Sequence, residues 1–285
     1  MENAIGIDLG GSKVIAVKVG RDFRIVKKVR ADFSGKSRKE VLDKVLCCID
    51  SLSDNGTSGI GMGIAGVVKN GVLVKSPNMK HMEKTDFKKL LGKKYGKKVV
   101  CENDARCFAF AEAARTGAKN FIALTLGTGI GAGIFIDGSL YMGKNSAGEI
   151  GHMTIKYDGL RCHCGNTGCY EEYASGRGVE RLCKKITGKK ISPKEANELA
   201  SKSDRKAKKV WDEYGRLVGA GLASLCYIFD PELIIIGGGI SGAFGHFEKS
   251  MREEMRKRLF IPLPEIKTGL PEDNAFGAAC MTLRK

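Results

Sequence analysis

The chain has 285 residues, of which 42% are hydrophobic and 28% are charged, and its formal net charge is +16. This length suits one large domain or two of ordinary size, and the composition excludes a disordered or collagen-like chain. No apolar run approaches the roughly 20 residues of a membrane span. The start, MENAIGIDLGG, lacks the basic segment and cleavage site of a secretory signal. We therefore expect a soluble cytoplasmic protein without a membrane partner.

Hydrophobic periodicity predicts alternating strands and helices in the first part of the chain. The expected strands are 4–9, 14–19, 60–65, 71–75 and 99–101, and the expected helices are 38–51, 84–95 and 105–115. The two opening strands are joined by a turn at Gly10, Gly11 and Ser12. Glycine lets such a turn bring backbone N–H groups close to a phosphate.

The pattern restarts after Gly117. Strands at 121–126 and 131–136 flank a second glycine turn, and a strand at 233–236 ends in three glycines. The other expected elements are helices at 174–186, 193–201, 205–228, 245–258 and 274–283. Two strand–glycine turn–strand units predict a duplicated α/β fold that holds a nucleotide between two lobes. We expect the lobes to be 1–116 and 117–272, with a final helix at 273–285 that packs back on the first lobe.

The positive charge is spread over segments 84–98, 184–194 and 202–209, where it alternates with leucines and aromatics at helical spacing. This pattern is typical of solvated helix faces, and the chain has no RNP-like motif, two-pair zinc finger or basic tail. A nucleic-acid partner is therefore disfavoured. A basic surface that attracts an anionic substrate is the better interpretation.

Three of the ten cysteines fall within eight residues, whereas the others lie in apolar stretches. Cys162, Cys164 and Cys169, preceded by His152, provide three thiolates and an imidazole, a closed tetrahedral set for a structural zinc ion. The alternative is three reduced cysteines in a loop. His163 is a competing imidazole that we expect to point away.

Several motifs together resemble the ROK family of sugar kinases, within the actin/hexokinase/Hsp70 ATPase superfamily. DLGGSK at 8–13 and LGTGIGAGI at 126–134 resemble its phosphate motifs, and LIIIGGGIS at 233–241 resembles its adenosine motif. ENDA at 102–105 resembles the sugar and catalytic motif. The most specific match is GEIGH at 148–152 followed by CHCGNTGCYE at 162–171. The resemblance implies an α/β, two-lobe actin-like ATPase (ribonuclease H-like) fold with a structural zinc loop.

The resemblance identifies Asp104 as the general base. Phosphorylation of a sugar hydroxyl needs a carboxylate that orients the attacking oxygen and accepts its proton. The competing interpretation is that Asp104 caps the following helix, which is a common position for aspartate.

The resemblance also implies a set of sugar contacts. Asn103 and the carboxylates of Glu149 and Glu171 are expected to bond hydroxyls, because each hydroxyl needs an acceptor. His152 is expected to bind zinc with one ring nitrogen and sugar with the other, and Gly66 to offer a backbone contact. We expect Glu172, beside Glu171, to face solvent.

The nucleotide is expected to bind with Mg2+. Asp8 resembles the carboxylate associated with this ion, acting through water. The phosphates and adenosine are expected to lie against Gly10, Gly11, Ser12, Lys13, Gly127, Thr128, Gly129, Gly237, Gly238 and Gly239.

These features predict an ATP-dependent enzyme that phosphorylates the 6-hydroxyl of glucose. Kinases of N-acetylmannosamine, N-acetylglucosamine or fructose are the alternatives, and the resemblance implies a homodimer or homotetramer. Other phosphate donors, such as polyphosphate, remain open. A sugar-responsive transcriptional regulator is disfavoured, because family repressors carry a helix-turn-helix domain before the first phosphate motif and we expect none here.

Overall fold

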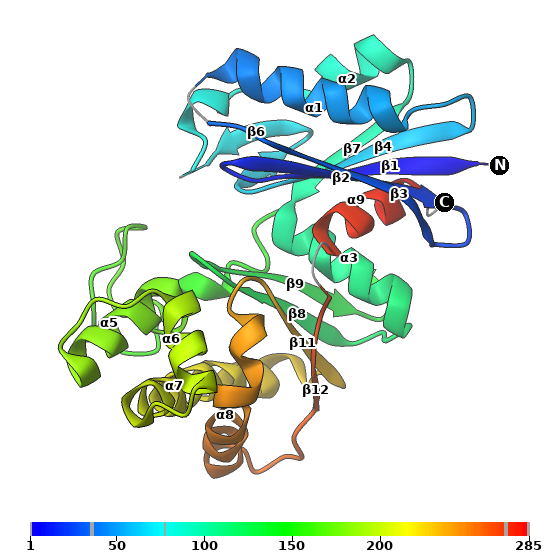
Figure 1. Ribbon diagram of the computed structural model, residues 1–285. Helices are drawn as coiled ribbons and strands as arrows, with labels where there is room; N and C mark the ends of the chain where they lie inside the picture. Colours follow the sequence, from blue (N-terminus) through cyan, green and yellow to red (C-terminus); the bar gives the residue numbers. More distant parts are fainter. Residues whose placement is uncertain (1, 35–36, 77, 271–272, 284–285) are drawn as a thin grey trace. The chain divides into compact units, whose positions relative to one another are not determined.

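The computed structural model describes residues 2–34, 37–76, 78–270 and 273–283. The chain divides into two compact units, each with its own sheet (Figure 1). Unit 1 comprises 1–117 and 270–285, and unit 2 comprises 118–269. The expected lobe boundary at 272 and the expected helix end at 285 lie outside the described residues.

Unit 1 contains a five-stranded sheet in the order β3-β2-β1-β4-β7. Its strands are β1 (Asn3–Leu9), β2 (Lys13–Gly20), β3 (Ile25–Asp32), β4 (Thr57–Ile64) and β7 (Lys98–Asn103). β1, β4 and β7 are parallel, whereas β2 and β3 are antiparallel additions. A separate hairpin is formed by β5 (Val67–Lys69) and β6 (Val72–Lys75).

The two faces of β1 are covered by different helices, because successive side chains of a strand alternate between faces. Ile5, Ile7 and Leu9 share a core with α1 (Arg38–Leu52) and α2 (Phe87–Tyr95). Ala4 shares a second core with α3 (Asp104–Thr116) and α9 (Asp273–Leu283). Figure 1 shows α1 and α2 on one side of this sheet and α9 on the other.

Glycines in β1 and β4 allow the backbone of α9 to pack directly against the backbone of these two strands. A Cβ on Gly6 would lie 1.9 Å from the Ala275 carbonyl oxygen, and one on Gly61 would lie 1.7 Å from that of Ala278. On the other side of the helix, a Cβ on Gly277 would lie 1.7 Å from the Cys107 carbonyl oxygen of α3. α9 is therefore packed closely between the sheet and α3.

Unit 2 repeats this strand order in the sheet β10-β9-β8-β11-β12. The strands are β8 (Phe121–Leu126), β9 (Ile130–Ile136), β10 (Ser139–Leu140), β11 (Leu233–Gly237) and β12 (Glu265–Thr268). β8, β11 and β12 are parallel, and β9 and β10 are antiparallel. The matching order accords with the predicted duplication.

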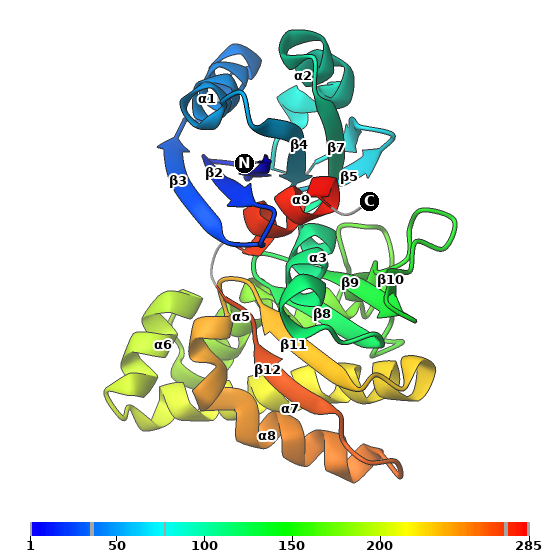
Figure 2. The same cartoon turned by 90° about the vertical axis from the view of Figure 1, so that its right-hand side faces the viewer.

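One face of this second sheet packs against helices. They are α4 (Tyr170–Ala174), α5 (Gly176–Thr187), α6 (Pro193–Ser201), α7 (Arg205–Phe229) and α8 (Phe244–Arg258). α7 and α8 lie side by side (Figure 2), where Gly215 and Gly219 leave room for the backbone of α8. Short 3-10 turns occur at Lys80–Met82, Ile150–His152 and Ser241–Ala243.

Three differences from the predicted elements have local causes. The helix expected at 174–186 is interrupted at Ser175, whose extended backbone separates α4 from α5. α2 begins at Phe87 rather than near 84, because the Asp86 side chain accepts the N–H of Lys89 and caps the helix. β3 was not predicted, because it is an exposed edge strand with four charged residues and no regular alternation.

Among the described residues, no helix has the combined length and apolar composition that crossing a bilayer requires.

Candidate functional site

The expected catalytic groups of unit 1 meet at the carboxyl ends of its parallel strands. Leu9 of β1 pairs with Ile64 of β4, and Ile64 pairs with Asn103 of β7. Asp8, Gly66 and Asp104 lie within two residues of these paired positions. In open α/β sheets ligands bind at this edge, so sequence-distant groups share one location.

Asn103, not Asp104, caps α3. Its Oδ1 accepts the N–H groups of Ala105 and Arg106, at 2.9 and 3.3 Å, and its Nδ2 donates to the Gly66 carbonyl at 3.0 Å. The side chains of Asn103 and Asp104 also share a hydrogen bond, which lowers the pKa of Asp104 against the effect of burial. Because the cap is Asn103, the carboxylate of Asp104 is not needed as the N-cap group, although it accepts the Ala105 N–H at 3.0 Å.

The electrostatics of this edge favour a proton on Asp104. Desolvation raises the pKa of Asp104 to about 7, and the negative charge of Asp8 adds to the shift. Burial also raises the pKa of Asp8, against the hydrogen bond from Asn274 and the charge of Lys13. A carboxylate with a pKa near neutrality is well matched to general-base chemistry.

Two supporting groups were not predicted from the sequence. Arg106, in the first turn of α3, forms a buried ion pair at 3.1 Å with Glu102 near the end of β7. Asn274, at the start of α9, donates to Asp8 at 3.5 Å. Glu102 and Arg106 are close in the sequence, whereas no local signal links residue 274 to residue 8.

Each of the two expected phosphate turns is closed by a hydrogen bond from its first glycine. The Gly10 N–H donates to the Lys13 carbonyl at 3.1 Å, and the Gly127 N–H donates to the Gly129 carbonyl at 3.0 Å. A Cβ on Gly127 would meet no atom within 4 Å. Glycine at 127 therefore leaves open space beside the backbone, which fits the approach of a phosphate.

The glycines after β11 pack against the end of β8. Gly238 has a φ of +84°, and a Cβ there would lie 2.4 Å from the Leu126 carbonyl oxygen, which accepts the Ile240 N–H at 3.0 Å. A Cβ on Gly239 would meet nothing within 4 Å. Within unit 2, the expected adenosine turn and second phosphate turn thus lie at one sheet edge.

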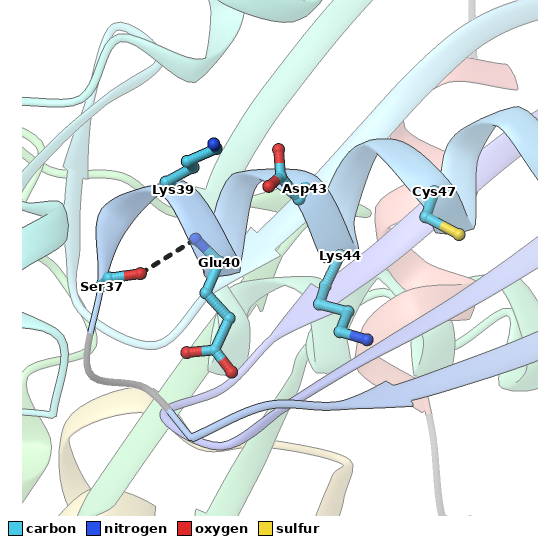
Figure 3. A pocket seen from close by; sticks show the side chains of 6 residues that line it. All are labelled: Ser37, Lys39, Glu40, Asp43, Lys44 and Cys47. Carbon is cyan, nitrogen blue, oxygen red and sulfur yellow. Dashed lines mark hydrogen bonds between the residues drawn. The ribbon is translucent and has the colours of Figure 1, made fainter.

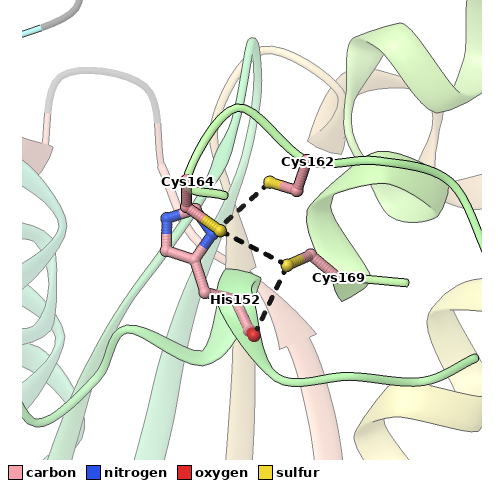
Figure 4. A group of neighbouring side chains, drawn as sticks. All are labelled: His152, Cys162, Cys164 and Cys169. Atoms are coloured by element: carbon pink, nitrogen blue, oxygen red, sulfur yellow. Dashed lines mark hydrogen bonds between the residues drawn. The ribbon is translucent and has the colours of Figure 1, made fainter. Parts of the chain in front are cut away.

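The predicted metal ligands converge. One donor atom from each of His152, Cys162, Cys164 and Cys169 lies within 4.8 Å of the others (Figure 4). The Cys164 and Cys169 sulfurs are 3.6 Å apart, and His152 Nδ1 lies 3.8 Å from the Cys162 sulfur. A tetrahedron with zinc–sulfur bonds of about 2.3 Å has edges of about 3.8 Å. The donor set therefore fits a zinc ion.

Two expectations about the neighbours of this cluster are wrong. His163 does not point away, since its Nδ1 lies 3.8 Å from the Cys162 sulfur and 3.5 Å from a Glu171 carboxylate oxygen. Glu172 does not face solvent, because its side chain is 2% exposed and pairs with Arg181. The helical phase of α4, which only the fold determines, turns both glutamates inward.

The three remaining sugar-contact candidates differ in setting. Glu149 is exposed, its carbonyl accepts the His152 N–H at 3.0 Å, and its side chain does not cap the turn that follows. His152 directs Nδ1 towards sulfur, which leaves Nε2 for another partner. Glu171 is buried, accepting the Ile130 N–H at 2.9 Å and Arg177 Nη2 at 2.7 Å. Arg177 was not predicted from the sequence.

A pocket along the first turns of α1 is separate from these groups (Figure 3). It is lined by Ser37, Lys39, Glu40, Asp43, Lys44 and Cys47. None of these is a predicted site residue, so the pocket plays no part in the proposed chemistry.

The fold matches proteins of known structure. The crystal structure of a ROK family glucokinase from Streptomyces griseus, in complex with glucose and AMPPNP, matches with a TM-score of 0.84 and 30% identity over 98% of both chains. The model of the ROK family matches residues 4–276, and the chain belongs to this family.

Curated relatives include both kinases and regulators. A glucokinase from Thermotoga maritima is 34% identical over 84% of this chain and 82% of its own length. An N-acetyl-D-glucosamine kinase from Haemophilus influenzae is 27% identical over 98% of this chain and 99% of its own. A xylose repressor from Bacillus spizizenii also matches.

Proposed function

We propose that this protein is an ATP-dependent sugar kinase that phosphorylates the 6-hydroxyl of a hexose, with glucose as the first candidate. The carboxyl edge of the unit 1 sheet supports this proposal most strongly. There, Asp104 has a pKa near 7 while Asn103 caps the helix in its place. A desolvated carboxylate with a pKa near neutrality is suited to accept a proton from a hydroxyl, which favours catalysis over binding alone.

In this proposal each group of the candidate site has a separate role. Asp104 orients the attacking hydroxyl and takes its proton, and the Asn103 amide holds a sugar oxygen. Asp8 holds Mg2+ through water, and the turns at 10–13 and 127–129 present N–H groups to the phosphates. Mg2+ would neutralise charge on the transferred phosphoryl group.

The substrate assignment rests on relatives of more than one specificity, a glucokinase and an N-acetyl-D-glucosamine kinase among them. A coupled assay of ADP release over glucose, mannose, fructose, N-acetylglucosamine and N-acetylmannosamine tests it, with polyphosphate as a second donor. We expect the largest kcat/KM for glucose with ATP. Turnover of another sugar would correct the specificity. No turnover of any sugar, together with DNA binding at physiological salt, would favour a regulator.

We also propose that the cluster of His152 and three cysteines holds a structural zinc ion. Metal analysis of purified protein should then find about one zinc per chain, since one four-ligand set holds one ion. Cys164→Ser should lower that content, destabilise the protein and raise the sugar KM, because His152 and Glu171 flank the loop. The buried, isolated Cys226 provides the control, as Cys226→Ser should keep the zinc. Full activity in zinc-free protein would contradict the proposal.

A further inference from the structure

The end of the cysteine loop is hydrogen-bonded to the second phosphate turn at two points. The Gly176 N–H, at the start of α5, donates to the Gly127 carbonyl at 2.8 Å. From the other side, the Ile130 N–H donates to a Glu171 carboxylate oxygen at 2.9 Å. The turn at 127–130 is therefore held at both ends by α4 and α5.

The contact with Glu171 is close enough to restrict the sequence of the turn. A Cβ on Gly129 would lie 2.4 Å from the same Glu171 oxygen. Position 129 therefore requires glycine, because a side chain there would collide with the Glu171 carboxylate. Gly127, in contrast, faces open space.

Arg177 contacts the other oxygen of the Glu171 carboxylate. Its Nη2 lies 2.7 Å from Oε1, which is also 3.5 Å from His163 Nδ1, whereas the Ile130 N–H donates to Oε2. The Glu171 side chain is 8% exposed, whereas Arg177 is 41% exposed. A charge-assisted bond to a buried carboxylate is stronger than a surface ion pair. Without Arg177, the buried charge would lose a close cationic partner.

We propose that Arg177 is a positioning residue that holds the Glu171 carboxylate against the Ile130 amide. In this way the position of the carboxylate that faces the sugar is coupled to the conformation of the phosphate turn at 127–130. The role of Glu171 towards sugar rests on the proposed function. The coupling of Arg177 to the turn rests on the hydrogen bonds alone.

Arg181 provides a matched control. It lies one turn further along α5, has a similar exposure of 44%, and pairs with the neighbouring glutamate, Glu172. In the described part of the chain, Arg181 contacts neither Glu171 nor the turn. Arg181→Ala therefore removes the same type of side chain and an ion pair with Glu172, which Arg177 also contacts at 3.5 Å, while the Arg177–Glu171 bond stays in place.

Hydrogen exchange of the peptide 126–134 tests the coupling without any substrate. Arg177→Ala should accelerate exchange at the Ile130 amide at least about tenfold, because a charge-assisted bond is lost. Arg181→Ala should leave that amide unchanged. Arg177→Lys keeps the positive charge and a nitrogen donor, so the Ile130 amide should be better protected than in Arg177→Ala. This partial recovery distinguishes loss of the contact from general misfolding. Equal exchange in Arg177→Ala and the parent protein would overturn the proposal.

Ligand binding then separates this inference from the proposed function. Calorimetry with AMPPNP in the absence of sugar should show that Arg177→Ala binds the nucleotide at least about fivefold more weakly than the parent protein does. The sugar KM should be raised as well. A rise in sugar KM with unchanged AMPPNP affinity would refute the link to the phosphate turn. If the parent protein phosphorylates no sugar while the exchange result holds, the coupling stands and the proposed function fails.

Discussion

At the scale of single residues, the chemistry of the site depends on what surrounds each carboxylate. Asp8 lies near the end of β1 and Asp104 directly follows β7, in the same sheet. Burial raises the pKa of both carboxyls, and the negative charge of Asp8 raises that of Asp104 further. Asn103 supplies the helix cap and leaves Asp104 for another task. Because Asp104 is not the N-cap residue and its pKa is about 7, its carboxylate is suited to act as the base for a sugar hydroxyl.

Asp104→Asn should abolish most turnover while retaining sugar affinity. The amide can still hydrogen-bond to a hydroxyl, but it cannot accept the proton, so kcat should fall about 10²–10⁴-fold or more. Steady-state kinetics with isothermal titration of the sugar measures both effects. A variant with near-native kcat would show that Asp104 is not the base.

The pH profile should reflect the same carboxylate. The base works only when deprotonated, and its folded pKa of about 7 lies above the ordinary value of 3.8. kcat/KM should therefore rise with pH and level off above about 7, with an apparent pKa that falls as Mg2+ neutralises Asp8. A profile that is flat between pH 5 and 8 would contradict the assignment.

At the scale of elements, close backbone approach decides where α9 lies. The helix reaches the sheet through Gly6 and Gly61 and reaches α3 through its own Gly277. Its first turn also carries Asn274, which contacts Asp8, so the position of α9 affects the carboxyl edge of the sheet where the candidate base lies.

Gly277→Ala should destabilise the protein by about 1–3 kcal/mol or more, because the new Cβ would collide with the Cys107 carbonyl. Gly92→Ala is the matched control in α2, where a Cβ meets nothing within 4 Å. That change should be neutral or stabilising by up to about 1 kcal/mol, since alanine favours helix. Urea denaturation measures both, and equal effects would disprove the packing argument.

At the scale of the whole molecule, the candidate groups are divided between two units with the same strand order. Unit 1 carries Asp8 and Asp104, and unit 2 carries the second phosphate turn, the adenosine turn and the cysteine cluster. The net charge of +16 belongs to the chain as a whole and acts on any anionic ligand.

Salt should therefore affect the two substrates differently. Raising the ionic strength from about 0.05 to about 0.5 M shortens the range of electrostatic attraction, so the KM for ATP should increase. The KM for an uncharged sugar, measured at saturating ATP, should change much less. Parallel increases in both constants would show that the basic surface does not act on the nucleotide.

Local chemistry is what the sequence by itself determined. The glycine turns, the Cys162–Cys169 spacing and most helices follow from neighbouring residues, because turn geometry, ligand spacing and periodicity act over a few positions. Only the tertiary structure decided that Glu172 is buried, that His163 approaches Cys162, and that Glu171 contacts both Arg177 and the Ile130 amide. It also decided the pKa of Asp104, which depends on the distant Asp8. Burial and charge coupling arise between residues far apart in the chain, so they exist only once the fold has brought those residues together.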